Sequence, residues 1–292
     1  MCLSAGHDPT HPSSHTVGLS AYKFQRDHHP LKGETTTPRF TPLNSTMSQE
    51  IVLFDLPSQD PCRSWSLNPW KTRLLLNYKG IPYKTTWLEY PDIAPRFQSL
   101  GVPAHKPGAS YADHTVPAVK LPDGRYVMES EAIAQELDKL FPEPSLPLDL
   151  DLVREVQGFV GDTVYKAARL TLPRVARDII RAGSSEYFNR TKGERLGGVG
   201  TSLDQIEKEL NLDEAWKTVE PGLRKIGDLL RANDQGPFLL GQTVSYADFV
   251  IVGLLHFFRR VGEDVYQRAV AVEPLLAELY EASKPWLVRD DH

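Results

Sequence analysis

Short polar residues stand at two places where the sequence predicts that a helix begins. The stretch "SQDPCRSWSLNPWKTR" (58–73) carries serines and a cysteine before one helical pattern, and "ESEAIAQEL" (129–137) opens another with an acid and a serine. A helix N-terminus presents unpaired N–H groups and the positive end of the helix dipole, so both places favour an anion. We therefore expect a thiolate to be stabilised at the first place and a carboxylate at the second.

The second place suits the two charged ends of a free amino acid. Ser130 opens the helix and can donate its hydroxyl hydrogen to a carboxylate, while Glu129 can pair with an ammonium group. Taken alone, the two residues also have the plainer interpretation of a helix cap.

The first place offers two kinds of sulfur chemistry. A helix N-terminus lowers the pKa of a nearby thiol, so Cys62 could itself be a thiolate nucleophile. It could equally be a small buried or loop residue. A serine hydroxyl in the same stretch can instead donate to the sulfur of a bound thiolate.

Pro117 interrupts the strand pattern "TVPAVKL" (115–121). A central strand rejects proline, so this strand end requires an edge position or a special backbone geometry. A cis bond between Val116 and Pro117 is one such geometry, and it would turn the backbone N–H and C=O of Val116 outward.

The elements that must position these residues follow from the periodicity of the first half of the chain. An apolar run, a helical pattern and an alternating run predict a β-α-β unit, and two strands around the turn "PDG" then lead into a further helix. The proline-containing stretch between the β-α-β unit and the two later strands predicts a loop. The expected elements are strands at 51–56, 83–90, 115–121 and 125–130, and helices at 69–80 and from 130. This order predicts an α/β thioredoxin-like domain.

The second half predicts helices alone. A proline-rich segment, 141–151, reads as a linker, and helical spacing follows at 151–181, 203–232, 244–261 and 272–283. Ser245 and Asp248 form a capping-box pattern. We therefore predict a disordered extension (1–46), a thioredoxin-like domain (47–141), a linker (142–150) and an all-helical domain (151–292).

Composition narrows the class of protein. The net charge of −5 and the pI of about 6.0 provide no basic surface for nucleic acid, and no apolar run approaches the roughly 18 residues of a membrane span. Two cysteines, Cys2 and Cys62, fit a reducing compartment, which predicts a cytoplasmic protein. Residues 1–46 carry five of the nine histidines at irregular spacing, so no metal is expected there or elsewhere.

Three motifs in the observed order resemble those of cytosolic glutathione transferases. They are "TVPAV" (115–119), "ESEAIAQEL" and, after a "GQ" turn, "SYADF" (245–249), and the resemblance covers roughly residues 50–285. Three further stretches resemble the fungal etherase-type members, relatives of the bacterial lignin β-etherases: "WSLNPWKTRLLLNYKGIPY", "WLEYPDIAP" and "EYFNRTKGERLG".

The resemblance implies that glutathione is the cosubstrate. Ser130 would bind the γ-glutamyl carboxylate, Glu129 the ammonium group of the same residue, and Val116 the cysteinyl backbone, with Pro117 cis. The partner would be a small hydrophobic electrophile, possible acceptors being aryl ethers and isothiocyanates. It would bind between the domains against residues 58–68 and the helix near Tyr165 and Arg169. A homodimer is also implied.

Two registers compete for the residue that faces the sulfur of glutathione. "SQDPCRS" resembles a motif of some classes and would nominate Ser58, but Pro61 lies 20 residues before Ile81, too far for the expected three-turn helix. Pro69 lies 12 residues before Ile81. We therefore predict Ser66 as the catalytic residue, with an inserted loop at 57–65. The alternates are Ser64 and Asn68.

Two other functions remain open from the sequence. Cys62 could form a mixed disulfide, which would make the protein a thiol transferase or deglutathionylase. Alternatively, the chain could be a non-catalytic module that binds glutathione or another ligand.

Overall fold

The structure, a computed structural model, describes residues 50–108, 110 and 112–291. The expectation that residues 1–46 are a disordered extension without a metal site lies outside these residues. The expected domain boundaries at 47–141, 142–150 and 151–292 stay predictions.

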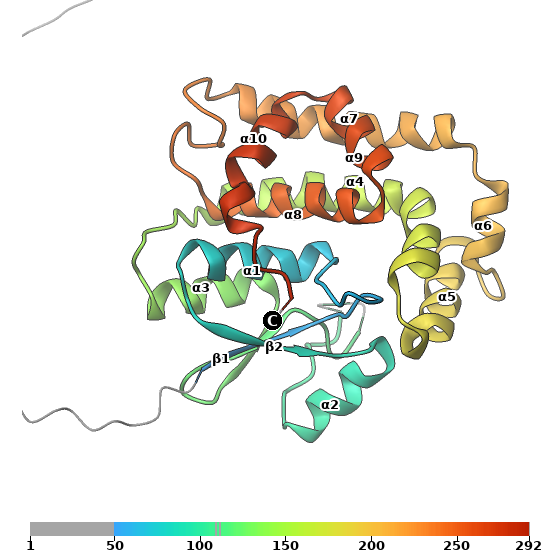
Figure 1. Cartoon of the computed structure of the whole chain (residues 1–292), viewed down its shortest axis with the longest axis horizontal. Coiled ribbons are helices and arrows are strands. Elements are labelled where there is room, and N and C mark those ends of the chain that lie inside the picture. Colours follow the sequence, from blue (N-terminus) through green and yellow to red (C-terminus); the bar gives the residue numbers. More distant parts are fainter. Residues whose placement is uncertain (1–49, 109, 111, 292) are drawn as a thin grey trace, which may run out of the picture. The chain divides into compact units, whose positions relative to one another are not determined.

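A four-stranded mixed sheet forms the base of the first half of the chain (Figure 1). The strands are β1 (Ile51–Asp55), β2 (Tyr83–Trp87), β3 (Ala118–Lys120) and β4 (Tyr126–Met128), in the spatial order β2-β1-β3-β4. β1 and β2 are parallel, while β3 is antiparallel to both β1 and β4. The parallel pair needs a crossover, which α1 (Leu67–Tyr78) supplies. This arrangement confirms the thioredoxin-like fold class.

Helices cover both faces of this sheet. α1 and α3 (Ser130–Leu140) lie on one face, and α2 (Ile93–Ser99) lies on the other, where Phe97 packs edge-on against Phe54 of β1 (Figure 1). The prediction of a loop in this stretch was wrong: α2 follows a short 3₁₀ turn, η1 (Tyr90–Asp92). Pro91 and Pro95 lie in the first turns of these helices, where a missing N–H costs no intrahelical hydrogen bond.

The second half is all-helical, as predicted. Its elements are α4 (Leu150–Arg174), a π turn η2 (Val175–Ile179), α5 (Ala182–Gly197), α6 (Leu203–Glu209), α7 (Leu212–Arg231), α8 (Tyr246–Val261), α9 (Glu263–Val272), α10 (Leu275–Ser283) and η3 (Lys284–Trp286). The single helix expected at 203–232 was wrong. The chain is extended at Leu210, and the side chain of Asn211 caps α7 by accepting from the N–H groups of Asp213 and Glu214.

α5 and α9 were also missed by the sequence patterns. α5 is polar and contains three glycines, which are typical of loops. At one of them a side chain would collide with the chain that follows: a Cβ on Gly193 would lie 2.2 Å from the carbonyl oxygen of Thr201. This glycine therefore serves close helix packing.

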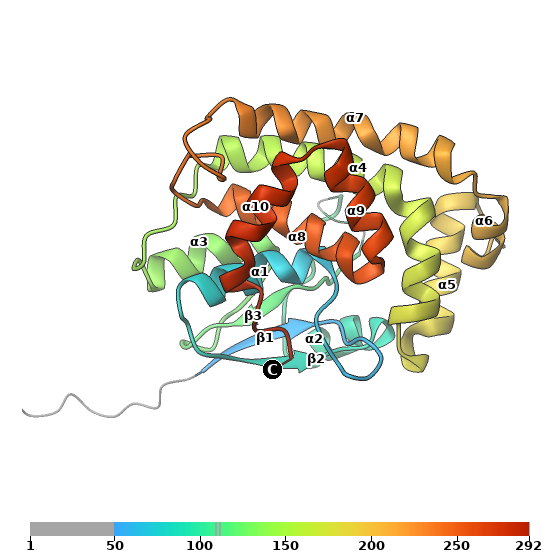
Figure 2. The same ribbon diagram turned by 45° about the horizontal axis from the view of Figure 1, so that its top comes forward.

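α8 joins the two halves. Thirteen of its 16 residues are buried, because α1 packs on one side of it and α4 on another (Figure 2). The predicted capping box is confirmed: the Ser245 hydroxyl accepts from the N–H of Asp248, and the Asp248 carboxylate accepts from the N–H of Ser245 at 2.7 Å. The walls of the site described below are therefore held by one shared core.

Within the described residues, no helix combines the length and apolarity that crossing a bilayer requires.

Candidate active site

Two cavities meet beside the start of α1. The larger, about 590 Å³, we call the polar cavity; its lining is Asn68, Lys71, Ser110, Thr115, Val116, Pro117, Glu129, Ser130, Glu131, Ala132, Gln135 and Gln157. The smaller, about 300 Å³, we call the apolar cavity; its lining is Leu56, Trp65, Ser66, Leu67, Asn68, Tyr90, Ile93, Val116, Gly161, Val164, Tyr165, Ala168, Thr171, Leu172, Phe188, Lys192, Arg195, Leu196 and Phe257. Asn68 and Val116 line both cavities, so the boundary between them lies at these residues.

Ser66 lies at the N-terminus of α1, directly before the first helical residue, Leu67. Its backbone is extended and its hydroxyl makes no hydrogen bond to the first turn, although serine commonly caps a helix in that way. The side chain instead borders the apolar cavity. The expected place of Ser66 before the helix is confirmed, and it leaves the hydroxyl available to a ligand.

The alternates Ser64 and Asn68 have different surroundings. Ser64 is fully buried and lines neither cavity, so the structure does not bring it to the site. The Asn68 carbonyl oxygen accepts from the Lys71 ammonium at 2.9 Å, which leaves the amide N–H groups as donors at the boundary of the cavities.

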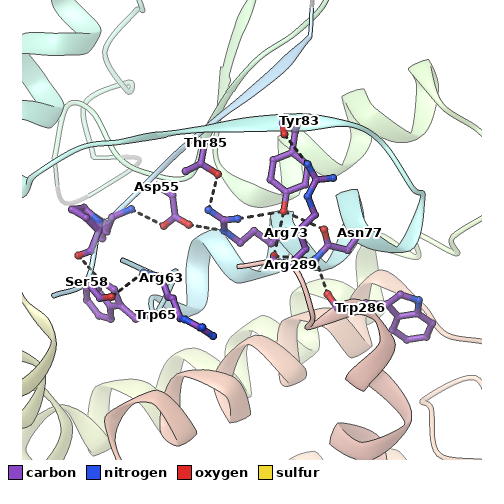
Figure 3. A network of polar contacts seen from close by, with 12 residues as sticks. Asp55, Ser58, Arg63, Trp65, Arg73, Asn77, Tyr83, Thr85, Trp286 and Arg289 are labelled. Atoms are coloured by element: carbon purple, nitrogen blue, oxygen red, sulfur yellow. Dashed lines mark hydrogen bonds and ion pairs between the residues drawn. The ribbon is translucent and has the colours of Figure 1, made fainter. Parts of the chain in front are cut away.

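The loop before Ser66 is fixed by polar contacts inside the first half of the chain (Figure 3). The indole N–H of Trp65 donates to the carbonyl of Pro57 at 3.3 Å, and the Ser58 hydroxyl accepts from the N–H of Arg63 at 3.0 Å. Ser58 is thus a structural residue of the loop. At the end of β1, Asp55 forms a fully buried ion pair with Arg73 of α1 at 2.8 Å.

The C-terminal segment holds the same region from the other side. The carbonyl of Asp290 accepts from the N–H of Ser64 at 2.9 Å, two residues before Ser66. Farther along α1, Asn77 donates to the carbonyl of Trp286 at 2.7 Å, and Arg289 donates to the carbonyl of Tyr83 at 3.0 Å (Figure 3). The position of Ser66 therefore depends on residues more than 200 positions away in sequence.

Cys62 lies in this loop but lines neither cavity. Burial raises the pKa of its thiol, and the nearby Arg181 guanidinium offsets only part of this effect. A raised pKa lowers the thiolate fraction at neutral pH, which is the opposite of what a reactive cysteine needs.

Val116, Pro117, Glu129 and Ser130 all come together in the polar cavity. The Val116–Pro117 peptide bond is cis, as predicted. Glu129 has a φ of 72°, a left-handed conformation that is uncommon for residues other than glycine and that is found preferentially at functional sites. The Glu129 carboxylate accepts from the Thr115 hydroxyl at 3.0 Å and lies 3.2 Å from the His105 ring nitrogen.

Two residues of this cavity region escaped the sequence analysis. Lys71 is 8% exposed, and burial lowers the pKa of its ammonium to about 8, although the Glu129 carboxylate acts in the opposite direction. Tyr246, the first residue of α8, is fully buried beside Ser130, and burial raises the pKa of its phenol. Both lie within quoted motifs, "SLNPWKTR" and "SYADF", but only the packing of α1 and α8 shows that their side chains are buried at this site.

The apolar cavity lies between the two halves of the chain, where the acceptor site was expected. Tyr165 of α4 lines it as predicted, but Arg169 does not; its guanidinium donates to the carbonyl of Leu196 at 2.9 Å. The cavity also contains Lys192 and Arg195 of α5, the helix that the sequence did not predict.

Comparison with known proteins identifies the family. The profile described as "Glutathione S-transferase, N-terminal domain" matches residues 65–140, and that described as "Glutathione S-transferase, C-terminal domain" matches residues 154–279. The glutathione S-transferase-like protein ustS of Aspergillus flavus is 31% identical over 84% of this chain and 94% of its own length. The chain belongs to the glutathione S-transferase family.

Solved fungal structures agree with this transferase in fold. A glutathione S-transferase of Ceriporiopsis subvermispora in complex with glutathione has a TM-score of 0.72 and 31% identity, over 83% of this chain and 100% of its own. Glutathione transferase GSTFuA3 from Phanerochaete chrysosporium has a TM-score of 0.72 and 27% identity, over 82% and 98%. The transferase activity and glutathione as cosubstrate thus follow from the family.

Proposed function

We propose that this transferase uses Ser66 to stabilise the thiolate of glutathione and directs the sulfur into the apolar cavity, onto a small hydrophobic electrophile. The observation that carries the proposal is the meeting of the two cavities at Asn68 and Val116, beside a helix N-terminus whose serine hydroxyl is not used as a cap. A ligand that fills the polar cavity can therefore place its sulfur next to Ser66.

The charged groups of the polar cavity suit the γ-glutamyl end of glutathione. We assign its carboxylate to the Ser130 hydroxyl and the first N–H groups of α3, and its ammonium group to the Glu129 carboxylate. The backbone of Val116, before the cis bond, is assigned to the cysteinyl residue. The sulfur would then lie near the boundary between the cavities.

Two effects lower the activation free energy of conjugation in this arrangement. The N–H groups at the start of α1 and a hydroxyl donor lower the pKa of the thiol, and the apolar walls hold the acceptor next to the sulfur. With an aryl ether, the carbon–sulfur bond forms as the carbon–oxygen bond breaks, and the leaving aryloxide takes a proton from solvent. With an isothiocyanate, the sulfur adds to the central carbon and the nitrogen takes the proton.

The surroundings of Cys62 weigh against the alternative of thiol transfer. Its thiol lies outside both cavities and has a raised pKa, so it is poorly placed to attack a disulfide of bound glutathione. We further propose that the enzyme is cytoplasmic, on the basis of its two cysteines, and that it works as a homodimer, as the resemblance implies.

A substrate panel tests the proposed function. Purified enzyme is assayed for glutathione-dependent turnover of aryl ethers, isothiocyanates and 1-chloro-2,4-dinitrobenzene, and for thiol transfer to a mixed disulfide. We expect conjugation that survives Cys62→Ser. Thiol transfer that disappears with Cys62→Ser, or glutathione binding with no turnover of any acceptor, would contradict the proposal.

A further inference from the structure

We infer that the acceptor carries an anionic oxygen group, such as a carboxylate on an aromatic ring, and that Lys192 binds it. The inference rests on the proposed function, because it names the class of acceptor for the same site. It is carried by the position of Lys192 in the wall of the apolar cavity, by the rings that hold its side chain, and by the signs of the charges that line the cavity.

Aromatic rings hold Lys192 in place. Its ammonium nitrogen lies 5.5 Å from the ring centroid of Tyr90 and 5.8 Å from that of Phe188, and these two rings are themselves 5.3 Å apart. Cation–π contacts of this kind fix a lysine that would otherwise be a flexible side chain. All three residues line the apolar cavity, so the ammonium group forms part of its wall.

The charged residues of the cavity lining have one sign. Lys192 and Arg195 contribute cations, and none of the lining residues is an aspartate or glutamate. Burial, with a smaller contribution from the nearby Arg195, lowers the pKa of Lys192 to about 8, so the lysine is still about nine-tenths charged at pH 7. A cation in such surroundings gains more from an anion than it would in water.

The remaining walls suit the ring of the acceptor. Trp65 and Phe257 lie 6.3 Å apart by ring centroids, and both border the cavity. Ser66 comes from the start of α1, whereas Lys192 comes from α5. An acceptor can therefore expose its reacting carbon to the sulfur near Ser66 while a second substituent reaches Lys192.

The elements that pack against α5 carry further charged and titratable groups. On α5 the neighbouring charge is Arg195; η1 brings Tyr90 and, near the start of α5, Glu89, whose carboxylate accepts from the Ser184 hydroxyl. The other neighbouring elements contribute Tyr165 and Arg169 from α4, and Glu207 from α6, which pairs with Arg177 of the π turn η2.

Matched acceptors test the inference. 4-Chloro-3-nitrobenzoate carries a carboxylate where 1-chloro-2,4-dinitrobenzene carries a neutral nitro group, and both react by the same substitution. The carbon–sulfur bond forms, the carbon–chlorine bond breaks, chloride leaves with the electron pair, and the thiol proton goes to solvent. The quantity compared is the ratio of kcat/KM for the anionic acceptor to kcat/KM for the neutral one.

We expect Lys192→Gln to lower this ratio about tenfold, and Lys192→Arg to keep it within about threefold. Arg190→Gln is the matched control, because Arg190 lies on the same helix, pairs with Glu186 and does not line the cavity. In the wild type the ratio should fall as the pH rises through about 8, while in Lys192→Gln it should stay flat. The thiolate contributes equally to both acceptors and cancels. An unchanged ratio in Lys192→Gln, or an equal fall in Arg190→Gln, would overturn the inference.

Binding supplies a readout that does not need turnover. Affinities of S-(4-carboxybenzyl)glutathione and S-benzylglutathione are compared by titration calorimetry, and Lys192→Gln should weaken the first about tenfold more than the second. Equal weakening of both would overturn the inference. Absence of turnover with both chlorinated acceptors would instead contradict the proposed function, while the calorimetric comparison would still decide whether Lys192 binds an anion.

Discussion

Each of the two cavities contains one lysine whose pKa burial lowers to about 8, but the surroundings of the two lysines are opposite. Lys71, in the polar cavity, donates to Asn68 and faces the Glu129 carboxylate, which supports its charge. Lys192, in the apolar cavity, lies against two aromatic rings and near Arg195, which opposes its charge.

The difference supports the proposed division of recognition between the two cavities. The polar cavity combines Lys71 with Glu129 and Glu131, so it holds both signs of charge and suits the amino-acid end of glutathione. The apolar cavity holds positive charge alone, within mostly apolar walls, and so it favours a hydrophobic acceptor with an anionic group. If this division is correct, variants in the polar cavity should change the affinity for glutathione. Variants at the boundary or in the apolar cavity should change the rate of conjugation.

The largest effect is expected for Ser66→Ala. A free thiol titrates near 8.5, and if the hydroxyl and the helix N-terminus together lower this by about two units, the stabilisation is about 2.7 kcal/mol. Loss of the whole shift would reduce the thiolate fraction at pH 7 from roughly three-quarters to about 3%, so about 25-fold is the upper bound on the fall in turnover for this variant, which removes the hydroxyl and leaves the helix N-terminus in place. The measurement is the thiolate absorbance of bound glutathione against pH, together with kcat.

Ser64→Ala is the control for this variant, because Ser64 is fully buried and lines neither cavity. A shifted titration in Ser64→Ala with none in Ser66→Ala would show that the assigned register is wrong. A shift in Asn68→Ala alone would transfer the role to the amide at the boundary.

Ser130→Ala should weaken glutathione binding rather than slow the chemistry. A hydrogen bond to a charged group contributes roughly 1.5–3 kcal/mol, so we expect affinity to fall by at least about tenfold, with kcat at saturating glutathione changed less. Titration calorimetry with glutathione measures the affinity, and circular dichroism checks the fold. Undiminished affinity in a folded variant would show that Ser130 does not bind the γ-glutamyl carboxylate.

Lys71→Met should change how stability depends on pH. The pKa of Lys71 is about 8 in the folded state and about 10.4 in the unfolded state, so the unfolded chain holds more protons between these values. The free energy of unfolding of the wild type should therefore rise from pH 8 to 10 by about 2 kcal/mol relative to the variant. Urea unfolding at the two pH values measures this difference. If the free energy of unfolding changes equally with pH in the wild type and in Lys71→Met, Lys71 is not a buried cation.

Cys62→Ser should have the smallest effect. Because Cys62 lies outside both cavities and its thiol pKa is raised, conjugation rates and glutathione affinity should stay within about twofold of the wild type. Steady-state kinetics with 1-chloro-2,4-dinitrobenzene checks this. A loss of more than tenfold with the fold intact would show that the loop thiol takes part in the reaction.

Local patterns were reliable where the physical cause is local. The capping box at Ser245 follows from the hydrogen bonds of a single helix turn, and the structure confirms it. α1 begins at Leu67, two residues before the expected start at Pro69, and Ser66 directly precedes it as predicted. The patterns failed at α5, whose glycines serve packing against the following chain, and at 203–232, where Asn211 starts a second helix. Neither the close packing of the α5 glycines nor the helix break at Asn211 changes the spacing of apolar residues, so hydrophobic periodicity could not reveal them.

By itself the sequence determined the α/β and all-helical halves, because periodicity acts over a few residues. It also predicted the two helix N-termini and the joint role of Glu129 and Ser130 at one of them. Only the tertiary structure decided which serine borders a cavity, since the contact of Ser64 with Asp290 comes from the far end of the chain. It alone placed Lys71 and Lys192 in opposite surroundings. The pKa of a lysine depends on burial and on neighbouring charges, and both are set by segments that are distant in sequence and adjacent only after folding.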